Sequence, residues 1–439
     1  MDALPLISNE LPLQRLNKTG ERDPKTGVMR KYYKLALFLV AAFSFVCFLF
    51  YKTQYDKLYN VLEVLEFFGN GKTAGLGGCS TLITRPPAFQ RLSDDIYTYS
   101  AFCERSLASN FPDDCSIVTT AAIVKGSQDL TQIRCRLWYA GSTLPIDGVF
   151  AAAPVSGITR SNNGITPYQF SCESKYSAKI PYGVTFRTQD NQYESFVHIA
   201  DSLPSNTSPQ PDSVAICLLP PQTPEDTTYK ALEHVLLNTL FGVNNFLVYD
   251  YSLTRNFFRA LSLTRDLQPN IYLLPWNPPT HLTAIQTESL IQTDCLLRTK
   301  RLFETVMVLN NTQILVPRDH GATIQATLKE TNLKGHLKVT VRHFCSEMAP
   351  EASSDSNIYS LTSLEQASFD PNARHKVGVE SKVDFKSELV TVSEEFLVLH
   401  DYGACGKYEF ETSAKDTFLL EQRQRIENKV GRFFPKKTV

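Results

Sequence analysis

The sequence predicts an α/β fold with a mainly parallel sheet, preceded by a β-rich module and an N-terminal transmembrane helix. Strand-like runs alternate with helical stripes after residue 212, residues 96–186 are rich in β-branched and aromatic residues without a helical period, and residues 35–51 form an uncharged apolar run. The chain has 439 residues, enough for about two or three domains, and its net charge of −1 gives no indication of nucleic-acid binding.

The apolar run at residues 35–51 predicts one membrane-spanning helix, because its 17 residues reach the lower end of the length that crosses a bilayer. Arg30, Lys31 and Lys34 precede the run, so the N-terminal side is expected to stay in the cytosol, as in a type II signal anchor. A cleaved signal peptide is the weaker alternative, since the preceding tail is long and no Ala-x-Ala site follows. The short span favours the thinner membranes of the ER or Golgi.

The cysteines indicate an oxidising lumen. Cys47 lies in the apolar run, and the others are widely spaced without a CxxC pair, which favours scattered disulfides over a zinc site. Their number is odd, so at least one thiol is free or pairs with another chain: Cys79, Cys103, Cys115, Cys135, Cys172, Cys217, Cys295, Cys345 and Cys405. Asn206 begins a glycosylation sequon in a Pro/Ser-rich stretch, which predicts a glycoprotein.

Composition divides the chain into seven segments. They are a cytosolic tail (1–34), a transmembrane anchor (35–51), a stem (52–90), a β-rich luminal module (91–202), a linker (203–211), an α/β domain (212–410) and a C-terminal helix with a tail (411–439). In the stem, Leu58, Leu62 and Leu65 have helical spacing. This stripe would either join two chains as a homodimer or pack back on the body.

The segment after residue 212 alternates between strands and helices. Gly242 is expected to end the first helix. Strands are predicted at 214–219, 246–250, 271–274 and 306–309, and helices at 225–240, 255–263 and 283–301. Such a series forms a mainly parallel sheet whose ligands bind at the carboxyl ends of the strands. Asp250, Trp276 and the turn that begins at Asn310 follow strand ends, which makes them candidate site residues.

Several short motifs occur in a fixed order between about residues 130 and 405. They are CRLWYAG, VAICLLPP, FLVYDYS, YLLPWNPP, QTDCLLR, VMVLNNTQILVPR and VLHDYGAC. In their order and spacing the chain resembles glycosyltransferase family 92, a family of type II membrane β-galactosyltransferase-like proteins. The resemblance implies a GT-A-like, Rossmann-type domain. It also implies transfer of a hexose, galactose where established, from a nucleotide sugar (UDP-hexose) to a glycan or glycoprotein acceptor.

One motif departs from the family pattern. The family's turn reads Asp-x-Asp-Glu and holds Mn²⁺ against the sugar diphosphate, whereas Asn310, Thr312 and Gln313 occupy those positions here. The resemblance implies that these residues, together with Asp250, contact the donor. Because hard divalent cations prefer carboxylate oxygens, the neutral turn weakens the expectation of Mn²⁺ more than the expectation of the fold.

Other positions of the family motifs are retained. The resemblance implies a donor contact for Asp250, a catalytic role for Asp294 in positioning nucleotide or acceptor, and a metal or diphosphate contact for His400. The family's second His and its Arg in the last motif are replaced by Asp401 and Gly403.

Each of these candidates has a structural alternative. Asp250 could cap the following helix, and Asp294 could form a helix ion pair with Arg298 at i+4. His400 could be a buried, hydrogen-bonded imidazole, and Trp276 could anchor the core rather than stack on a sugar.

Two functions from different classes are compatible with these patterns. The first is an active glycosyltransferase that needs little or no metal, so that cations or helix amides stabilise the leaving diphosphate, with candidates Arg298, Lys300, Arg301 and Arg318. No general base is assigned: Asp319 and Asp401 are two candidates that the sequence does not rank. The second is a catalytically inactive relative of the family that binds glycans or a partner. An unrelated β-rich receptor would require that no parallel sheet follows residue 212.

Overall fold

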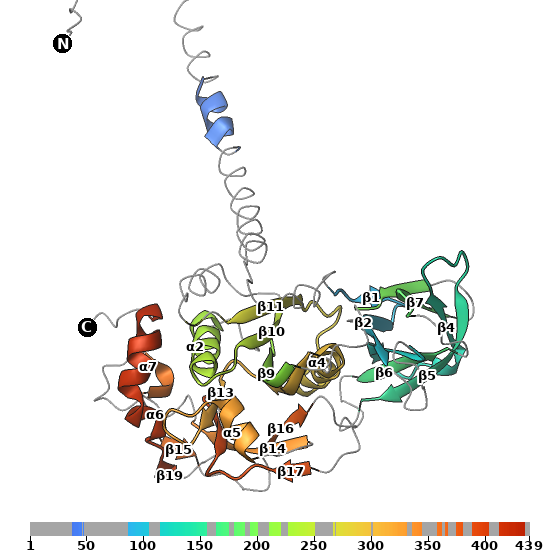
Figure 1. The fold of residues 1–439 in the computed structure, drawn as a ribbon. Coiled ribbons are helices and arrows are strands. Elements are labelled where there is room, and N and C mark those ends of the chain that lie inside the picture. Colours follow the sequence, from blue (N-terminus) through green and yellow to red (C-terminus); the bar gives the residue numbers. More distant parts are fainter. Residues whose placement is uncertain are drawn as a thin grey trace, which may run out of the picture. The chain divides into compact units, whose positions relative to one another are not determined.

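The computed structural model describes residues 37–45, 47, 87–104, 115–155, 164–174, 180–188, 194–200, 210–220, 227–250, 267, 269–299, 302–331, 336–344, 358–361, 365–367, 375–380, 389–403 and 412–434. The chain divides into two compact units, residues 1–71 and 72–439 (Figure 1).

The transmembrane helix predicted at residues 35–51 is not found. Among the described residues, no helix is long and apolar enough to cross a membrane. Residues 37–45 are helical and exposed.

In the second unit, eight strands form one antiparallel sheet in the order β1-β2-β3-β6-β5-β4-β7-β8 (Figure 1). Every neighbouring pair in this sheet is antiparallel. The strands are β1 (Gln90–Arg91), β2 (Ile96–Glu104), β3 (Ile117–Lys125), β4 (Ile133–Trp138), β5 (Ile146–Pro154), β6 (Ile165–Glu173), β7 (Gly183–Thr188) and β8 (Glu194–His198). In β4, every second residue from Ile133 to Leu137 is buried, as expected for a strand with one face on a core.

The sheet curls into a nearly closed barrel. A bridge between Ala101 and Ile199, and a 2.8 Å hydrogen bond from the amide of Ala200 to the carbonyl of Ala101, bring the end of the sheet back to β2. Two disulfides, Cys103–Cys115 and Cys135–Cys172, lie in its core.

A second sheet of nine strands follows in the order β11-β10-β9-β12-β16-β14-β18-β13, with β17 paired to β14. Its strands are β9 (Gln210–Leu218), β10 (Asn245–Asp250), β11 (Asn270–Pro275), β12 (Phe303–Leu309), β13 (Gln313–Pro317), β14 (His336–His343), β16 (His375–Glu380), β17 (Leu389–Thr391) and β18 (Leu397–Asp401). The pairs among β11, β10, β9 and β12 are parallel. This observation excludes the unrelated β-rich receptor, which required no parallel sheet here.

Two helices accompany these parallel strands. Helix α2 (Thr227–Leu240) is followed by Gly242 at φ +105°, so the predicted helix stop is confirmed. Helix α4 (Ala284–Thr299) begins with a capping box, in which the Thr283 hydroxyl accepts from the Gln286 amide and the Gln286 side chain accepts from the Thr283 amide. The helix predicted at 255–263 lies outside the described residues.

The predicted fold class, an α/β protein with a mainly parallel sheet behind a transmembrane helix, is wrong for the molecule. Strands predominate among the described elements, and one of the two large sheets is a barrel-like antiparallel sheet. Beyond β12 the second sheet is mixed, because β12 pairs with β16, β16 with β14, and β13 with β18 in antiparallel register. Strands β14, β15 and β16 have no continuous apolar run that predicts them from the sequence.

The remaining elements lie toward the C-terminus. They are α5 (Ile324–Thr331), the pair β15 (Glu365–Ala367) and β19 (Thr412–Lys415), and the helices α6 (Phe418–Glu421) and α7 (Arg423–Val430), with short 3-10 turns η2 (Leu130–Gln132), η3 (Tyr359–Leu361) and η4 (Gly431–Phe433).

Side chains join the two large sheets. The Tyr99 hydroxyl donates to the Pro275 carbonyl at 2.6 Å, and the Gln286 side-chain amide donates to the Ile165 carbonyl at 2.7 Å. Trp276 is buried and packs edge-on against Tyr99, so it is a core anchor. A third disulfide, Cys217–Cys295, ties β9 to α4, and the prediction of scattered disulfides is therefore confirmed.

Candidate functional site

The parallel strands bring the predicted edge residues together. Leu309 at the end of β12 is in register with Leu218 at the end of β9, and Asp250 at the end of β10 is in register with Pro275. The turn after β12 therefore lies at the carboxyl edge of these strands, where open α/β sheets bind ligands. Only the backbone of Asp250 is described, and it ends β10 at this edge.

The turn at residues 310–313 closes on itself. The Gln313 amide donates to the Asn310 carbonyl at 3.1 Å, and the Gln313 side-chain oxygen accepts from the Asn310 amide at 3.0 Å. Gln313 is buried, which leaves its side-chain NH₂ as a donor that needs an acceptor.

Asp401 on β18 is that acceptor. Thr312 donates its hydroxyl to Asp401 Oδ1 at 2.8 Å, and Gln313 donates Nε2 to Asp401 Oδ2 at 2.9 Å. The amide of Gly403 adds a third bond to Oδ1 at 3.1 Å. The negative charge at this site thus sits on β18 rather than in the turn, and a neutral, donating turn is what this carboxylate requires.

The residues around the turn do not fit a divalent cation. Mn²⁺ would need several oxygen ligands, with carboxylates supplying much of the affinity. The one carboxylate bonded to the turn already accepts three hydrogen bonds, and the turn offers it donors rather than further acids. In the described part of the chain, no group of three or more His, Cys, Asp or Glu side chains could hold a metal ion.

His400, predicted as a metal or diphosphate contact, lies inside the protein between charged groups. Its Nδ1 is 3.0 Å from the Tyr402 hydroxyl, and its Nε2 is 3.4 Å from Asp416 Oδ2, an approach that falls short of an aligned hydrogen bond. Burial lowers the pKa of His400, and the neighbouring Asp416 opposes this shift.

Asp416 is the centre of an ion network. Burial would raise the pKa of its carboxyl, but His400, the Phe418 amide and Arg318 outweigh burial and hold that pKa below its usual range. Arg318 and Arg342 approach Asp416 Oδ2 at 3.0 and 2.7 Å. Arg318, one of the cations considered for a leaving diphosphate, is therefore already paired.

Asp294, the predicted catalytic residue, is completely buried in α4. Arg298 donates to both of its carboxylate oxygens, at 3.1 and 3.2 Å, and the Tyr249 hydroxyl donates to Oδ2 at 2.5 Å. Burial, followed by the charge of Asp294, raises the pKa of Tyr249, so its hydroxyl keeps the proton that it donates. Arg298 also donates to Ser100 on β2 at 2.8 Å, so this pair contributes to the junction between the sheets.

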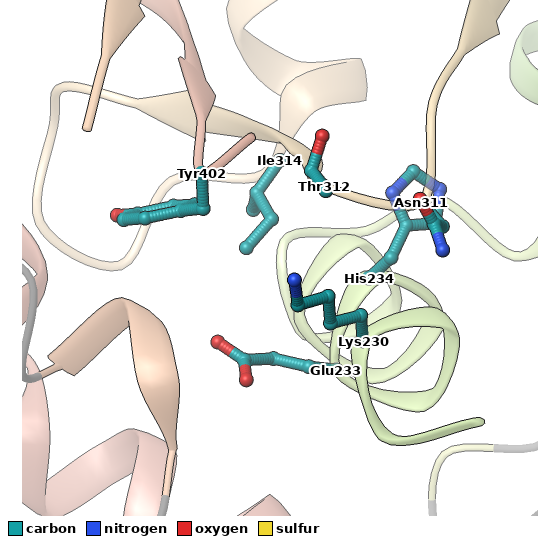
Figure 2. A pocket seen from close by; sticks show the side chains of 7 residues that line it. All are labelled: Lys230, Glu233, His234, Asn311, Thr312, Ile314 and Tyr402. Carbon is teal, nitrogen blue, oxygen red and sulfur yellow. The ribbon is translucent and has the colours of Figure 1, made fainter. Parts of the chain in front are cut away.

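A pocket lies beside the turn, on the side of α2. The pocket is small, with a cavity volume of about 20 Å³, and Figure 2 shows the residues that line it: Lys230, Glu233, His234, Asn311, Thr312, Ile314 and Tyr402. Of these, only Thr312 is a predicted site residue. In the sequence, helix α2 is recognised by its apolar stripe. Lys230, Glu233 and His234 are spaced so that they lie on one face of this helix, and this spacing was the signal that could have identified the pocket.

The fold and this edge define the class of site: a polar turn and a pocket at the carboxyl ends of parallel strands, where open α/β sheets bind ligands. Residues 212–418 match the sequence model of glycosyltransferase family 92. The match covers a little under half of the chain, and it supports the assignment of this part to that family and to the glycosyltransferase class.

Comparisons with other proteins add little. A comparison with curated proteins finds no match. Among solved structures, similarity is found to S. aureus TarS 1-349, at 9% identity over 43% of this chain and 60% of that chain, with a TM-score of 0.23. The apo WbbM bifunctional glycosyltransferase matches at 10% identity over 44% and 36%, with a TM-score of 0.21. Yersinia pseudotuberculosis HddC, complexed with GMP-PN, matches at 12% identity over 43% and 93%, with a TM-score of 0.25. The chain thus spans less than two thirds of TarS.

Proposed function

We propose that this protein transfers a hexose from a nucleotide sugar to a glycan acceptor without a tightly bound divalent cation. The family match over residues 212–418 supports the reaction class, and galactose from UDP-galactose is the donor that the family resemblance implies. The hydrogen bonds of Thr312 and Gln313 to Asp401 are the observation that supports sugar transfer without a metal ion.

Displacement of a nucleoside diphosphate leaves negative charge on the phosphates, which must be stabilised by cations or by aligned donors. In many enzymes a bound metal does this, but here the turn donates hydrogen bonds to a carboxylate and has no acid of its own. Arg298 and Arg318 pair with Asp294 and Asp416. Lys300 and Arg301 lie outside the described residues. The stabilising group must therefore be another cation or backbone amides.

The test is turnover of nucleotide sugars by the purified full chain. A panel of UDP- and GDP-hexoses is incubated with glycan acceptors, with a chelator or with added Mn²⁺, and products are identified by mass spectrometry. We expect one donor to be consumed at a similar rate in both conditions. Turnover that stops in the chelator would contradict metal independence.

The second candidate function is that of a catalytically inactive relative that binds a glycan or a partner. The same hydrogen bonds favour it, because a turn fully engaged with Asp401 leaves fewer groups for a donor. Absence of turnover for every donor, together with binding of a glycan by the folded chain, would support this candidate over the enzyme.

We also propose that residues 72–439 work in the lumen of the secretory route, in the ER or Golgi. Three disulfides join described cysteines, and such bonds persist in oxidising compartments. If the proposal holds, protein from secretory cells carries a glycan on Asn206 that an endoglycosidase removes, and Asn206→Gln abolishes the mobility shift. Unmodified Asn206 with reduced cysteines would contradict it.

A further inference from the structure

Strands β4, β7 and β8 of the barrel-like sheet turn one face toward solvent. Along each strand every second residue faces the interior of the barrel, so the residues between them point outward. The register of the strands places these outward residues in three rows, and we call this surface the outer face. The rows are Arg134–Arg187–Glu194, Arg136–Thr185–Phe196 and Trp138–Gly183–His198.

The first row places two arginines side by side. Arg134 on β4 and Arg187 on β7 are directly opposite each other, which brings their Cβ atoms to about 5 Å. Like charges in such a cross-strand pair destabilise a sheet. Among the residues that the structure describes, no ion pair joins either guanidinium to a carboxylate. An anion bound between these two arginines would therefore be stabilised by both of them.

Two acids near the arginines reduce the positive charge only in part. Asp147 on β5 is opposite Arg136 and pairs with it at 2.8 Å, so these two charges cancel. Glu194 is opposite Arg187 in register, but it is exposed and lies outside ion-pair distance of that guanidinium. The described residues of the outer face thus carry two unpaired guanidinium groups against one unpaired carboxylate, and this excess attracts anions.

Aromatic rings occupy the other rows of the outer face. Phe196 is central among them, because its ring centroid lies 6.2 Å from that of Trp138 and 4.7 Å from that of His198. Tyr182, the residue before β7, lies 6.2 Å from Phe196 on the same measure. Its side chain is 45% exposed, so a ligand can reach it. Together these side chains form an accessible aromatic surface beside the arginine row.

Local contacts hold the rings in place. Gly183 leaves room for Phe196, since a Cβ atom at this position would overlap the phenyl ring. The indole Nε1 of Trp138 donates to the Thr185 hydroxyl at 2.6 Å, which fixes the indole against the sheet. Rigid aromatic side chains lose little conformational entropy when they bind a ligand. The outer face is therefore organised before any ligand arrives.

The combination of arginines and aromatic rings fits an acidic glycan. A guanidinium binds a carboxylate or a sulfate through paired hydrogen bonds. A flat aromatic ring offers an apolar surface to the C–H groups of a sugar ring. Adjacent rows are about 7 Å apart along the strands, because two residues separate them, so a chain of linked sugars can reach from the arginines to the rings. A purely apolar partner would leave both arginines unpaired.

We infer that the outer face of β4, β7 and β8 binds an acidic glycan, with Arg134 and Arg187 holding a carboxylate or sulfate group and Phe196 and Tyr182 packing against neighbouring sugar rings. The choice of a glycan rests on the proposed function, in which a glycan is the acceptor or the bound ligand. The location is independent of the parallel strands and their turn, because the barrel-like sheet alone supplies these residues. The outer face holds the glycan and takes no part in the chemistry.

Calorimetric titration of the purified full chain, without any nucleotide sugar, tests the inference. The probes share one neutral core: lactose, sialylated lactose, which adds a carboxylate, and sulfated lactose. We expect at least one acidic probe to bind about 10-fold or more tightly than lactose, and the comparison of the two identifies the anionic group. Equal affinity for all three probes would overturn the inference.

Substitutions then locate the binding site. Arg134→Gln should weaken binding of the acidic probe by about 10- to 100-fold, the effect of losing one charge-assisted hydrogen bond, and leave lactose unchanged. Arg134 is exposed, so its loss should not unfold the protein. The matched control, Arg423→Gln, removes a partly exposed arginine of α7 and should leave every affinity unchanged. Unchanged affinity of Arg134→Gln for the acidic probe would place its site elsewhere and overturn the inference.

Tyr182→Ala and poly-aspartate separate a glycan from an acidic peptide. Tyr182→Ala removes a ring that packs on sugars, so it should weaken glycan binding by about 2- to 10-fold. Poly-aspartate that binds through Arg134, with no preference among the three sugars, would assign the outer face to an acidic peptide and overturn the inference.

Failure of the inference and failure of the proposed function are separable. Binding of an acidic probe that depends on Arg134, without any sugar transfer, supports the inference and contradicts the enzyme. Sugar transfer by a protein that shows no preference for acidic probes overturns the inference alone.

Discussion

At the scale of single residues, the neutral turn is explained by Asp401. Thr312 and Gln313 donate to its two oxygens, so amide and hydroxyl side chains are the complement of this carboxylate. An acid in the turn would face Asp401 across the β13–β18 pair, in which Gln313 is directly opposite Asp401.

The substitution Thr312→Asp should therefore destabilise the protein by about 2 to 4 kcal/mol, because it replaces a hydrogen bond to a charged group with like-charge repulsion. Urea unfolding measures this change. The matched control Thr312→Asn has nearly the same shape without the charge and should cost about 1 kcal/mol or less. Combining Thr312→Asp with Asp401→Asn should recover most of the loss; equal losses with and without Asp401→Asn would show that no repulsion exists.

His234 makes stability depend on pH. Burial lowers its pKa from 6.5 to about 4, and the Gln313 carbonyl, already shared with Asn238, opposes this shift only in part. Between these two pKa values the unfolded chain binds the proton and the folded chain does not, so stability falls as pH decreases from 6.5 to 4. The full loss is about 3 kcal/mol, at 1.36 kcal/mol per pKa unit.

Urea unfolding of the full chain at pH 7 and pH 4.5 measures this loss. His234→Gln should flatten the dependence relative to the wild type in the same window. If both proteins lose stability equally between these pH values, His234 is not held neutral by the fold.

At the scale of elements, the buried pair on α4 is the most consequential interaction. Asp294 and Arg298 lie one helical turn apart and are both buried, so removal of one partner leaves an uncompensated charge inside the protein. Their packing against Tyr249 and Ser100 connects α4 to both sheets.

Arg298→Met should destabilise the protein by about 3 to 5 kcal/mol. The control is the partly exposed i,i+4 pair of Arg423 and Glu427 on α7, where Arg423→Met should cost about 1 kcal/mol or less. Thermal or urea unfolding separates the two cases. Asp294→Asn answers the catalytic question: activity per folded molecule should be retained if Asp294 only supports the fold, and lost if it acts on substrate.

The sequence predicts helices and strands well where they depend on local signals, such as the spacing of apolar residues and helix caps. The helix predicted at 283–301 is found as α4, and the strand predicted at 306–309 is the end of β12, because apolar periodicity and the Thr283 cap are local signals. The contact between Thr312 and Asp401 spans 89 residues, so no spacing rule could reveal it. The antiparallel pairing of β12 with β16 is equally non-local, and it makes the second sheet mixed.

At the scale of the whole molecule, the second unit consists of two sheets tied by side chains and disulfides. Cys217–Cys295 links β9 and α4 across 78 residues and so restrains the part of the fold that presents the turn. In the chain-entropy account such a link contributes about 4 kcal/mol by constraining the unfolded state.

Replacing both Cys217 and Cys295 with Ala should lower the free energy of unfolding by about that amount, while Cys47→Ala, which removes an exposed free thiol, should change it little. Urea unfolding without reductant measures both. Equal stability of the wild type and the double variant would show that this bond does not form in the folded protein.

The proposed donor site works with a neutral turn and therefore without a divalent cation. Calorimetric titration of the full chain with a panel of nucleoside diphosphates, first with a chelator and then with Mn²⁺, tests it most directly. We predict that one nucleotide binds with the same affinity in both conditions. Binding that appears only with Mn²⁺, or no binding by any nucleotide, would contradict it.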